Sequence, residues 1–152
     1  MADTGKCPYP LRRLAGVLVL AASLLVPFAS AAGAEPVVIA HGALRVERID
    51  TDTLRALFGM RLRRWPDGEP VRVYVLPPDS AVHQAFVKAI LGVLPHRLER
   101  TWQTLVYTGT GQAPAQVDSE QEMLARVAAT PGAIGYLDQE PANAQVHVLR
   151  IR

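Results

Sequence analysis

Ser80 and the residues around it have the chemistry to bind an anion. A run in which apolar residues alternate with others ends at Pro78, and Asp79, Ser80, Ala81 and Val82 follow. A serine that begins a helix accepts a hydrogen bond from the first turn, whose other amide groups stay free at the positive end of the helix dipole. The stretch is predicted either to hold a small oxyanion or to use Ser80 only as a helix cap.

A group of arginines next to an aromatic residue is the second candidate site. Arg61, Arg63, Arg64 and Trp65 lie close together in the sequence. Arginine side chains bind anions and stack on aromatic rings, but they also cover a turn while their charged ends stay in water. The group is predicted to be a surface for a partner or an anion, or else a solvated turn with Trp65 in the core beneath it.

Other combinations of reactive residues do not form a recognisable catalytic site. Asp79, Ser80 and His83 are close in sequence, but a capping hydroxyl points along the helix axis while His83 projects from its side, and no glycine-flanked nucleophile turn is present. The other histidines are widely spaced, which argues against a metal site. We therefore expect no enzyme activity, no metal and no cofactor. Those histidines are His41, His96 and His147.

The first 34 residues have the pattern of a secretory signal peptide. Lys6, Arg12 and Arg13 precede the apolar run 14–28, and the small residues 32–34 come just before an acidic residue and a proline. The pattern predicts export and cleavage. Two alternatives stay open, an uncleaved membrane anchor and, for the paired arginines, twin-arginine export.

Cleavage after Ala34 would change the composition of the chain. The single cysteine, Cys7, would be lost, so the mature protein would have neither a thiol nor a disulfide. Three of the sixteen Lys and Arg residues and one of the fourteen Asp and Glu residues lie in the segment 1–34, so the remaining 118 residues carry thirteen of each. A single domain of zero formal net charge gives no reason to expect nucleic acid or an anionic membrane as a partner.

Hydrophobic periodicity places strands and helices alternately along residues 35–152. Trp102 shares an apolar stripe with Leu98 and Leu105, and Tyr136 lies in an apolar run, so both aromatic side chains are predicted to be buried. Strands separated by helices indicate an α/β sheet flanked by helices. The expected strands are 37–40, 71–75, 133–137 and 146–151, and the expected helices are 51–58, 80–91, 95–107 and 119–129.

Two blocks of the chain resemble the phosphate-type periplasmic substrate-binding proteins. The first runs from Phe58-Gly59 through Trp65-Pro66-Asp67-Gly68 to the helix start at Ser80, and the second is the run Gly132 to Tyr136. The resemblance covers nearly all of residues 35–152. It implies one lobe of a type II periplasmic binding protein, with a mixed sheet flanked by helices, acting in the periplasm as a solute-binding module of the phosphate ABC-transporter kind.

The resemblance also implies weak binding. In the family an Arg and an Asp precede a Gly-Ser-Gly-Thr segment whose amides and hydroxyls hold phosphate. Loss of an arginine that pairs a buried anion costs about 2 to 5 kcal/mol. The positions of this chain that correspond to the family's binding residues are Leu76, Pro78, Asp79, Ser80, Ala81 and Val82. Of these, only Ser80 is the same as in the family. Phosphate or another small oxyanion is therefore expected to bind weakly.

One lobe forms only half of a binding cleft, so a partner is expected to complete it. A second lobe, a homodimer mate or a membrane transporter would each serve. The alternative function is a periplasmic protein-interaction or regulatory module that kept the lobe but lost ligand binding.

Overall fold

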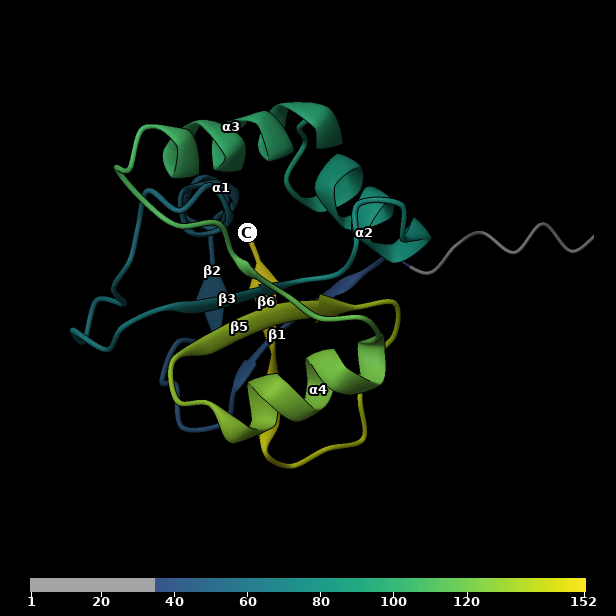
Figure 1. Ribbon diagram of the computed structural model, residues 1–152. Coiled ribbons are helices and arrows are strands. Elements are labelled where there is room, and N and C mark those ends of the chain that lie inside the picture. The colour runs from purple at the N-terminus through teal and green to yellow at the C-terminus, as the bar shows by residue number, and fades with distance from the viewer. Residues whose placement is uncertain (1–34) are drawn as a thin grey trace, which may run out of the picture. The chain divides into compact units, whose positions relative to one another are not determined.

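Short runs rich in Val, Ile and Leu form a six-stranded mixed sheet in the computed structural model, which describes residues 35–152 (Figure 1). The strand order is β2-β6-β1-β5-β3-β4. β1 pairs antiparallel with β5 and β6, whereas β3 runs parallel to β5 and β4, and β2 runs parallel to β6. The strands are β1 Val37–His41, β2 Arg48–Ile49, β3 Arg72–Val75, β4 Ala115–Gln116, β5 Ala133–Leu137 and β6 Val146–Ile151.

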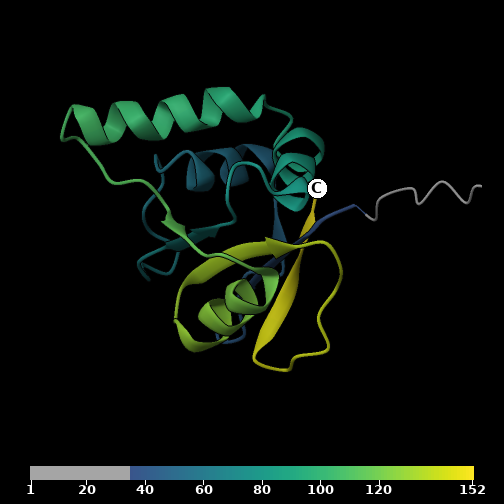
Figure 2. The ribbon, with the colours of Figure 1, turned by 45° about the vertical axis from the view of Figure 1, so that its right-hand side comes forward.

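Helices cover both faces of this sheet. α4 lies on one face, against β5 and β1, while α1, α2 and α3 gather on the other (Figures 1 and 2). The expected α/β sheet with flanking helices is confirmed. The helices are α1 Thr51–Phe58, α2 Ala81–Ala85, the π-helical segment η1 Phe86–Ile90, α3 Pro95–Tyr107 and α4 Glu120–Ala129.

Helix starts and buried aromatic residues agree with the sequence predictions. Asp50 caps α1 by accepting a 2.8 Å hydrogen bond from the Thr53 amide. Hydrogen bonds from the Thr53 hydroxyl and then from this amide lower the pKa of the Asp50 carboxyl. Pro95 occupies the first turn of α3. Trp102 and Tyr136 are both buried, as predicted.

One predicted helix has a different form in the structure. The helix expected from Ser80 to Leu91 begins as α2 but continues as the π-helical η1, in which the Leu91 amide donates to the Phe86 carbonyl at 3.2 Å. Phe86, the first residue of η1, stacks on Tyr136 with ring centroids 4.0 Å apart. The two-residue strands β2 and β4 were also not predicted, because so short a run has no period to read.

A tryptophan and a glycine join the two blocks that carry the family resemblance. The Trp65 indole donates a 3.0 Å hydrogen bond to the Gly132 carbonyl just before β5. Gly132 has a φ of 71°, and a Cβ there would overlap the Pro70 carbonyl. The turn at 65–70 and the start of β5 therefore fix the parallel pairing of β3 with β5.

Among residues 35–152 no helix is long and apolar enough to cross a membrane. The predicted signal peptide, residues 1–34, and its Cys7 lie outside the described residues.

Candidate functional site

The loop between β3 and α2 carries the predicted anion site. The Ser80 amide donates to the Pro77 carbonyl at 2.9 Å, which turns the chain, and Ser80 is the N-cap of α2. Its hydroxyl accepts from the His83 amide across a long 3.4 Å contact. Ser80 therefore caps α2, although loosely, and this contact is compatible with both predictions for the residue.

The first turn of α2 keeps free hydrogen-bond donors. Within residues 35–152 the amides of Ala81 and Val82 donate to no acceptor, and the first turn contains no acidic side chain. Ala81 is exposed and Val82 half-buried. Asp79, also exposed, puts a negative charge directly before these donors. The arrangement offers two amides and a hydroxyl to an oxyanion, while the nearby Asp79 carboxylate would repel it.

A buried hydrogen-bond network anchors this loop to the sheet. The Tyr136 hydroxyl on β5 accepts from the Leu76 amide at 2.9 Å and lies 2.6 Å from the His83 Nδ1 atom on α2. Burial raises the pKa of Tyr136 and lowers that of His83, so both groups are neutral. The phenol then donates its proton to Nδ1, and His83 carries its own proton on Nε2.

The same network rules out the Asp79, Ser80 and His83 combination as a catalytic triad, because the His83 ring bonds Tyr136 rather than Ser80. His83 Nε2 is buried and has no partner within the described residues, and its ring faces Trp102 with centroids 6.2 Å apart. His83 was not predicted to be buried. The sequence did contain a signal for this unusual histidine. Glu often stands three residues after a Ser cap, and His83 takes its place here.

A groove of about 310 Å³ opens beside this loop. Leu76 and Pro78 form one wall and the end of α3 forms the other. Leu76, the position opposite the family's arginine, is only 3% exposed and belongs to the core. At the rim Tyr107 is 91% and Val106 56% exposed, so two large side chains beside the groove face the solvent.

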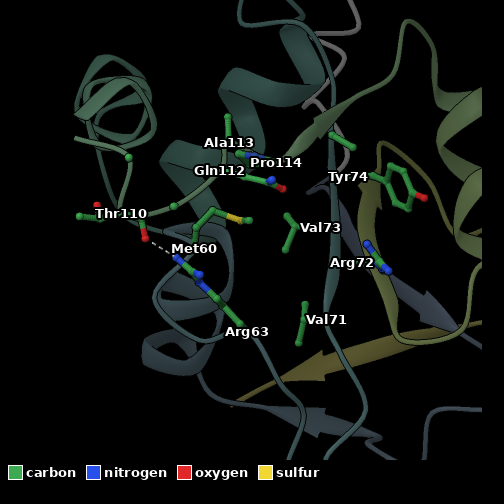
Figure 3. Close-up of a pocket in the computed structure, with 13 residues that line it drawn as sticks. Met60, Arg63, Val71, Arg72, Val73, Tyr74, Thr110, Gln112, Ala113 and Pro114 are labelled. Atoms are coloured by element: carbon green, nitrogen blue, oxygen red, sulfur yellow. Dashed lines mark hydrogen bonds between the residues drawn. The ribbon is translucent and has the colours of Figure 1, made fainter. Parts of the chain in front are cut away.

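The arginines near Trp65 do not share one surface. Arg63 donates to the Thr110 carbonyl at 2.9 Å and lines a pocket of about 680 Å³ between β3 and residues 109–115 (Figure 3). Arg64 donates to the Gly68 carbonyl at 2.9 Å, while Arg61 lines a separate pocket against α3. Trp65 is buried in the core. This is the position expected for it if the arginines cover a solvated turn.

In Figure 3 the side chains of Val71 and Val73 point toward Met60 and Arg63, whereas Arg72 and Tyr74 point to the opposite side of β3. Val71 and Val73 therefore form an apolar part of the pocket wall, and Arg63 faces them from the other side. Within residues 35–152 no group of three or more His, Cys, Asp or Glu side chains is placed to hold a metal ion.

No protein-family model matches the chain, and no curated protein matches it in sequence. Solved structures do. A protein of Clostridium perfringens described as a phosphate ABC transporter substrate-binding protein, solved with bound phosphate, aligns with a TM-score of 0.62 and 16% identity over 77% of this chain and 44% of its own.

Two further structures align almost as well. An ABC-type phosphate transport receptor of Vibrio cholerae and PstS of Borrelia burgdorferi each give a TM-score of 0.59 at 13% identity, over 77% of this chain and 46% and 47% of their own. The chain thus spans less than half the length of these structures. The fold it forms is that of part of a phosphate-type periplasmic substrate-binding protein.

Proposed function

We propose that this chain is a non-catalytic recognition module of the phosphate substrate-binding type, holding an oxyanion weakly at Asp79, Ser80, Ala81 and Val82. The observation that carries the proposal is the pair of unbonded amides at Ala81 and Val82 behind the Ser80 hydroxyl. The structural likeness to a protein solved with phosphate supports it.

The same residues limit the affinity. The Asp79 carboxylate repels an anion at these amides, and Leu76 is buried where the family has an arginine. Two amides and a hydroxyl without a cation correspond to a dissociation constant of about 1 mM or weaker, or roughly 4 kcal/mol. A second lobe, a homodimer mate or a membrane transporter would have to supply the missing cation for tight binding.

A titration with inorganic phosphate tests the proposal. The amide chemical shifts of Ser80, Ala81 and Val82 should move in the native chain, and Asp79→Gly should tighten binding because it removes the opposing charge. Ala81→Glu should abolish the response, since a carboxylate in the first turn occupies the same donors.

Ala125→Glu is the matched control, because Ala125 is an exposed alanine on α4 and receives the same charge away from the site. It should leave the phosphate response unchanged. If saturating phosphate moves none of the three amides in either the native chain or Asp79→Gly, the oxyanion site does not exist.

The exposed groove favours a second candidate function, a protein-interaction or regulatory module without a ligand. Val106 and Tyr107 at its rim are the observation in its favour. Sedimentation over a range of concentrations tests self-association. A dimer lost in Val106→Ser/Tyr107→Ser would identify the groove as an interface between copies.

We further propose that the module acts in the periplasm after removal of residues 1–34. The charged start, apolar run and small-residue end of that segment support export. The intact mass of the protein recovered from the periplasm should correspond to residues 35–152. Uncleaved protein in the inner membrane would contradict the proposal.

A further inference from the structure

We propose a second anion site, separate from the Ser80 loop, in a pocket formed by three arginines. Arg55 on α1, Arg61 just after α1 and Arg97 in the first turn of α3 all line this pocket of about 280 Å³. No acidic side chain lines it. The geometry points to a ligand that bears a phosphate group, and this inference does not depend on the proposed function.

The three guanidinium groups are in different states. Arg55 is fixed, because its Nε donates to the Leu91 carbonyl at 2.6 Å and its NH1 lies 2.8 Å from Asp52. Arg61 and Arg97 are exposed, and within residues 35–152 neither has a hydrogen bond or an ion pair through its side chain. One held arginine and two free ones leave a local excess of positive charge.

The position of Arg97 is unfavourable for the helix that carries it. The amino end of α3 is the positive end of its dipole, and the first turn of α3 contains no acidic side chain and no side-chain cap. A cation placed there destabilises the helix unless an anion accompanies it. The pocket lies beside this end, so a bound anion would offset the charge of Arg97 at the positive end of the dipole.

The walls of the pocket strengthen the electrostatic attraction. Leu91 and Leu98 are buried and Val93 is half-buried, so the arginines face a floor of low polarity. A charge interaction above such a floor is screened less than one in bulk water. A volume of 280 Å³ corresponds to roughly nine water molecules at ~30 Å³ each, enough for phosphate or pyrophosphate.

A glycine leaves space for Arg55. Gly92 has a φ of 63°, and a Cβ there would come within 2.9 Å of the Arg55 NH2 atom. Planar guanidinium groups suit phosphate because each offers two parallel donors to its oxygens.

A titration with inorganic pyrophosphate tests the site. The amides of Gly59, Gly92 and Thr101 should shift, and Arg61→Gln/Arg97→Gln should weaken binding at least tenfold. The matched control is Lys88→Gln/Arg100→Gln, which removes the same charge from exposed residues of η1 and α3 that do not line the pocket. The control should change affinity less than threefold.

Three outcomes would overturn the proposal: no shift at Gly59, Gly92 and Thr101, an equal loss of affinity in both double variants, or shifts confined to Ser80, Ala81 and Val82. The last outcome would support the proposed function while removing this site. A thermal melt of each variant confirms that it is folded.

The phosphate group could be free in solution or part of a lipid. Flotation with vesicles of phosphatidylglycerol and phosphatidylcholine separates the two sources, with pure phosphatidylcholine vesicles as the control. Binding to the anionic vesicles that Arg61→Gln/Arg97→Gln abolishes assigns the site to a lipid headgroup. Pyrophosphate binding without vesicle binding assigns it to a free phosphate compound.

Discussion

Within residues 35–152, α2 and α4 both begin with a serine cap, and of these two α2 leaves its amino end open. In α4 the Ser119 hydroxyl accepts from the Glu122 amide at 3.1 Å, and Glu122 in turn accepts from the Asp118 amide at 3.1 Å. The two residues therefore form a capping pair, although the carboxylate reaches the amide one residue before the cap. Glu120 adds a second carboxylate to the same turn and accepts from the Asp138 amide.

The amino end of α2 has the same serine without the acids. The cap distance is longer, at 3.4 Å, and His83 stands where α4 has Glu122. His83 turns into the core toward Tyr136, so it holds the helix from beneath instead of filling its amide end. The same serine signal thus closes one helix start against anions and leaves the other available to them.

Removing the Tyr136 hydroxyl should destabilise the α2 start most. Tyr136→Phe leaves the Leu76 amide and His83 Nδ1 buried without a partner, and each such group costs about 1 to 3 kcal/mol. Urea unfolding should show a loss of about 2 to 6 kcal/mol for the two groups together. Amide exchange should rise at Leu76 to His83, whereas the start of α4 should stay protected.

Tyr74→Phe is the matched control, because Tyr74 is half-buried and its hydroxyl makes only a 3.3 Å contact with the Thr130 hydroxyl. Its loss should stay below about 1 kcal/mol. A Tyr136→Phe variant no less stable than this control would mean that the network does not hold α2.

Acid should affect the two helix starts at different pH. Burial lowers the pKa of His83 below its ordinary 6.5, so the unfolded chain binds the proton more readily than the folded one. Stability is therefore full above about pH 6.5 and falls as the pH drops from there toward the lowered pKa, by up to about 1.4 kcal/mol per pH unit. Urea unfolding between pH 5 and 8 measures it, and His83→Gln should flatten the slope.

The α4 start should withstand more acid. Hydrogen bonding from the Asp118 amide lowers the pKa of Glu122 below its ordinary 4.5. Its contribution is present above that value and is lost only as the pH falls through the lowered pKa. Amide exchange at the two starts should separate them. Parallel slopes for the native chain and His83→Gln would show that His83 is not the source of the acid sensitivity.

Local patterns predicted most of the fold but little of the network around the site. Asp50, Pro95 and Ser119 mark helix starts by rules that involve only neighbouring residues, and these starts were found. The π-helical turn at η1 was not predicted, because the contacts of this segment, such as the stacking of Phe86 on Tyr136, join residues far apart in sequence.

The arginines show the same limit on predicting a site. Arg61, Arg63 and Arg64 are neighbours in sequence, yet the turn after α1 directs them into three different pockets. The companions of Arg61 are Arg55, on α1, and Arg97 on a separate helix. A charge count along the chain cannot find such a group, since only the packing of α3 against α1 brings it together.

The smallest expected effect compares the two serine caps directly. Ser119→Ala removes a 3.1 Å cap and should cost about 1 kcal/mol, the usual value for an N-cap. Ser80→Ala removes a 3.4 Å contact and should cost about 0.5 kcal/mol or less, because His83 and Tyr136 still hold α2. Urea unfolding of both variants measures the difference. Equal losses would mean that the α2 start depends on its serine as much as α4 does, and that the buried histidine does not take over the role of the cap.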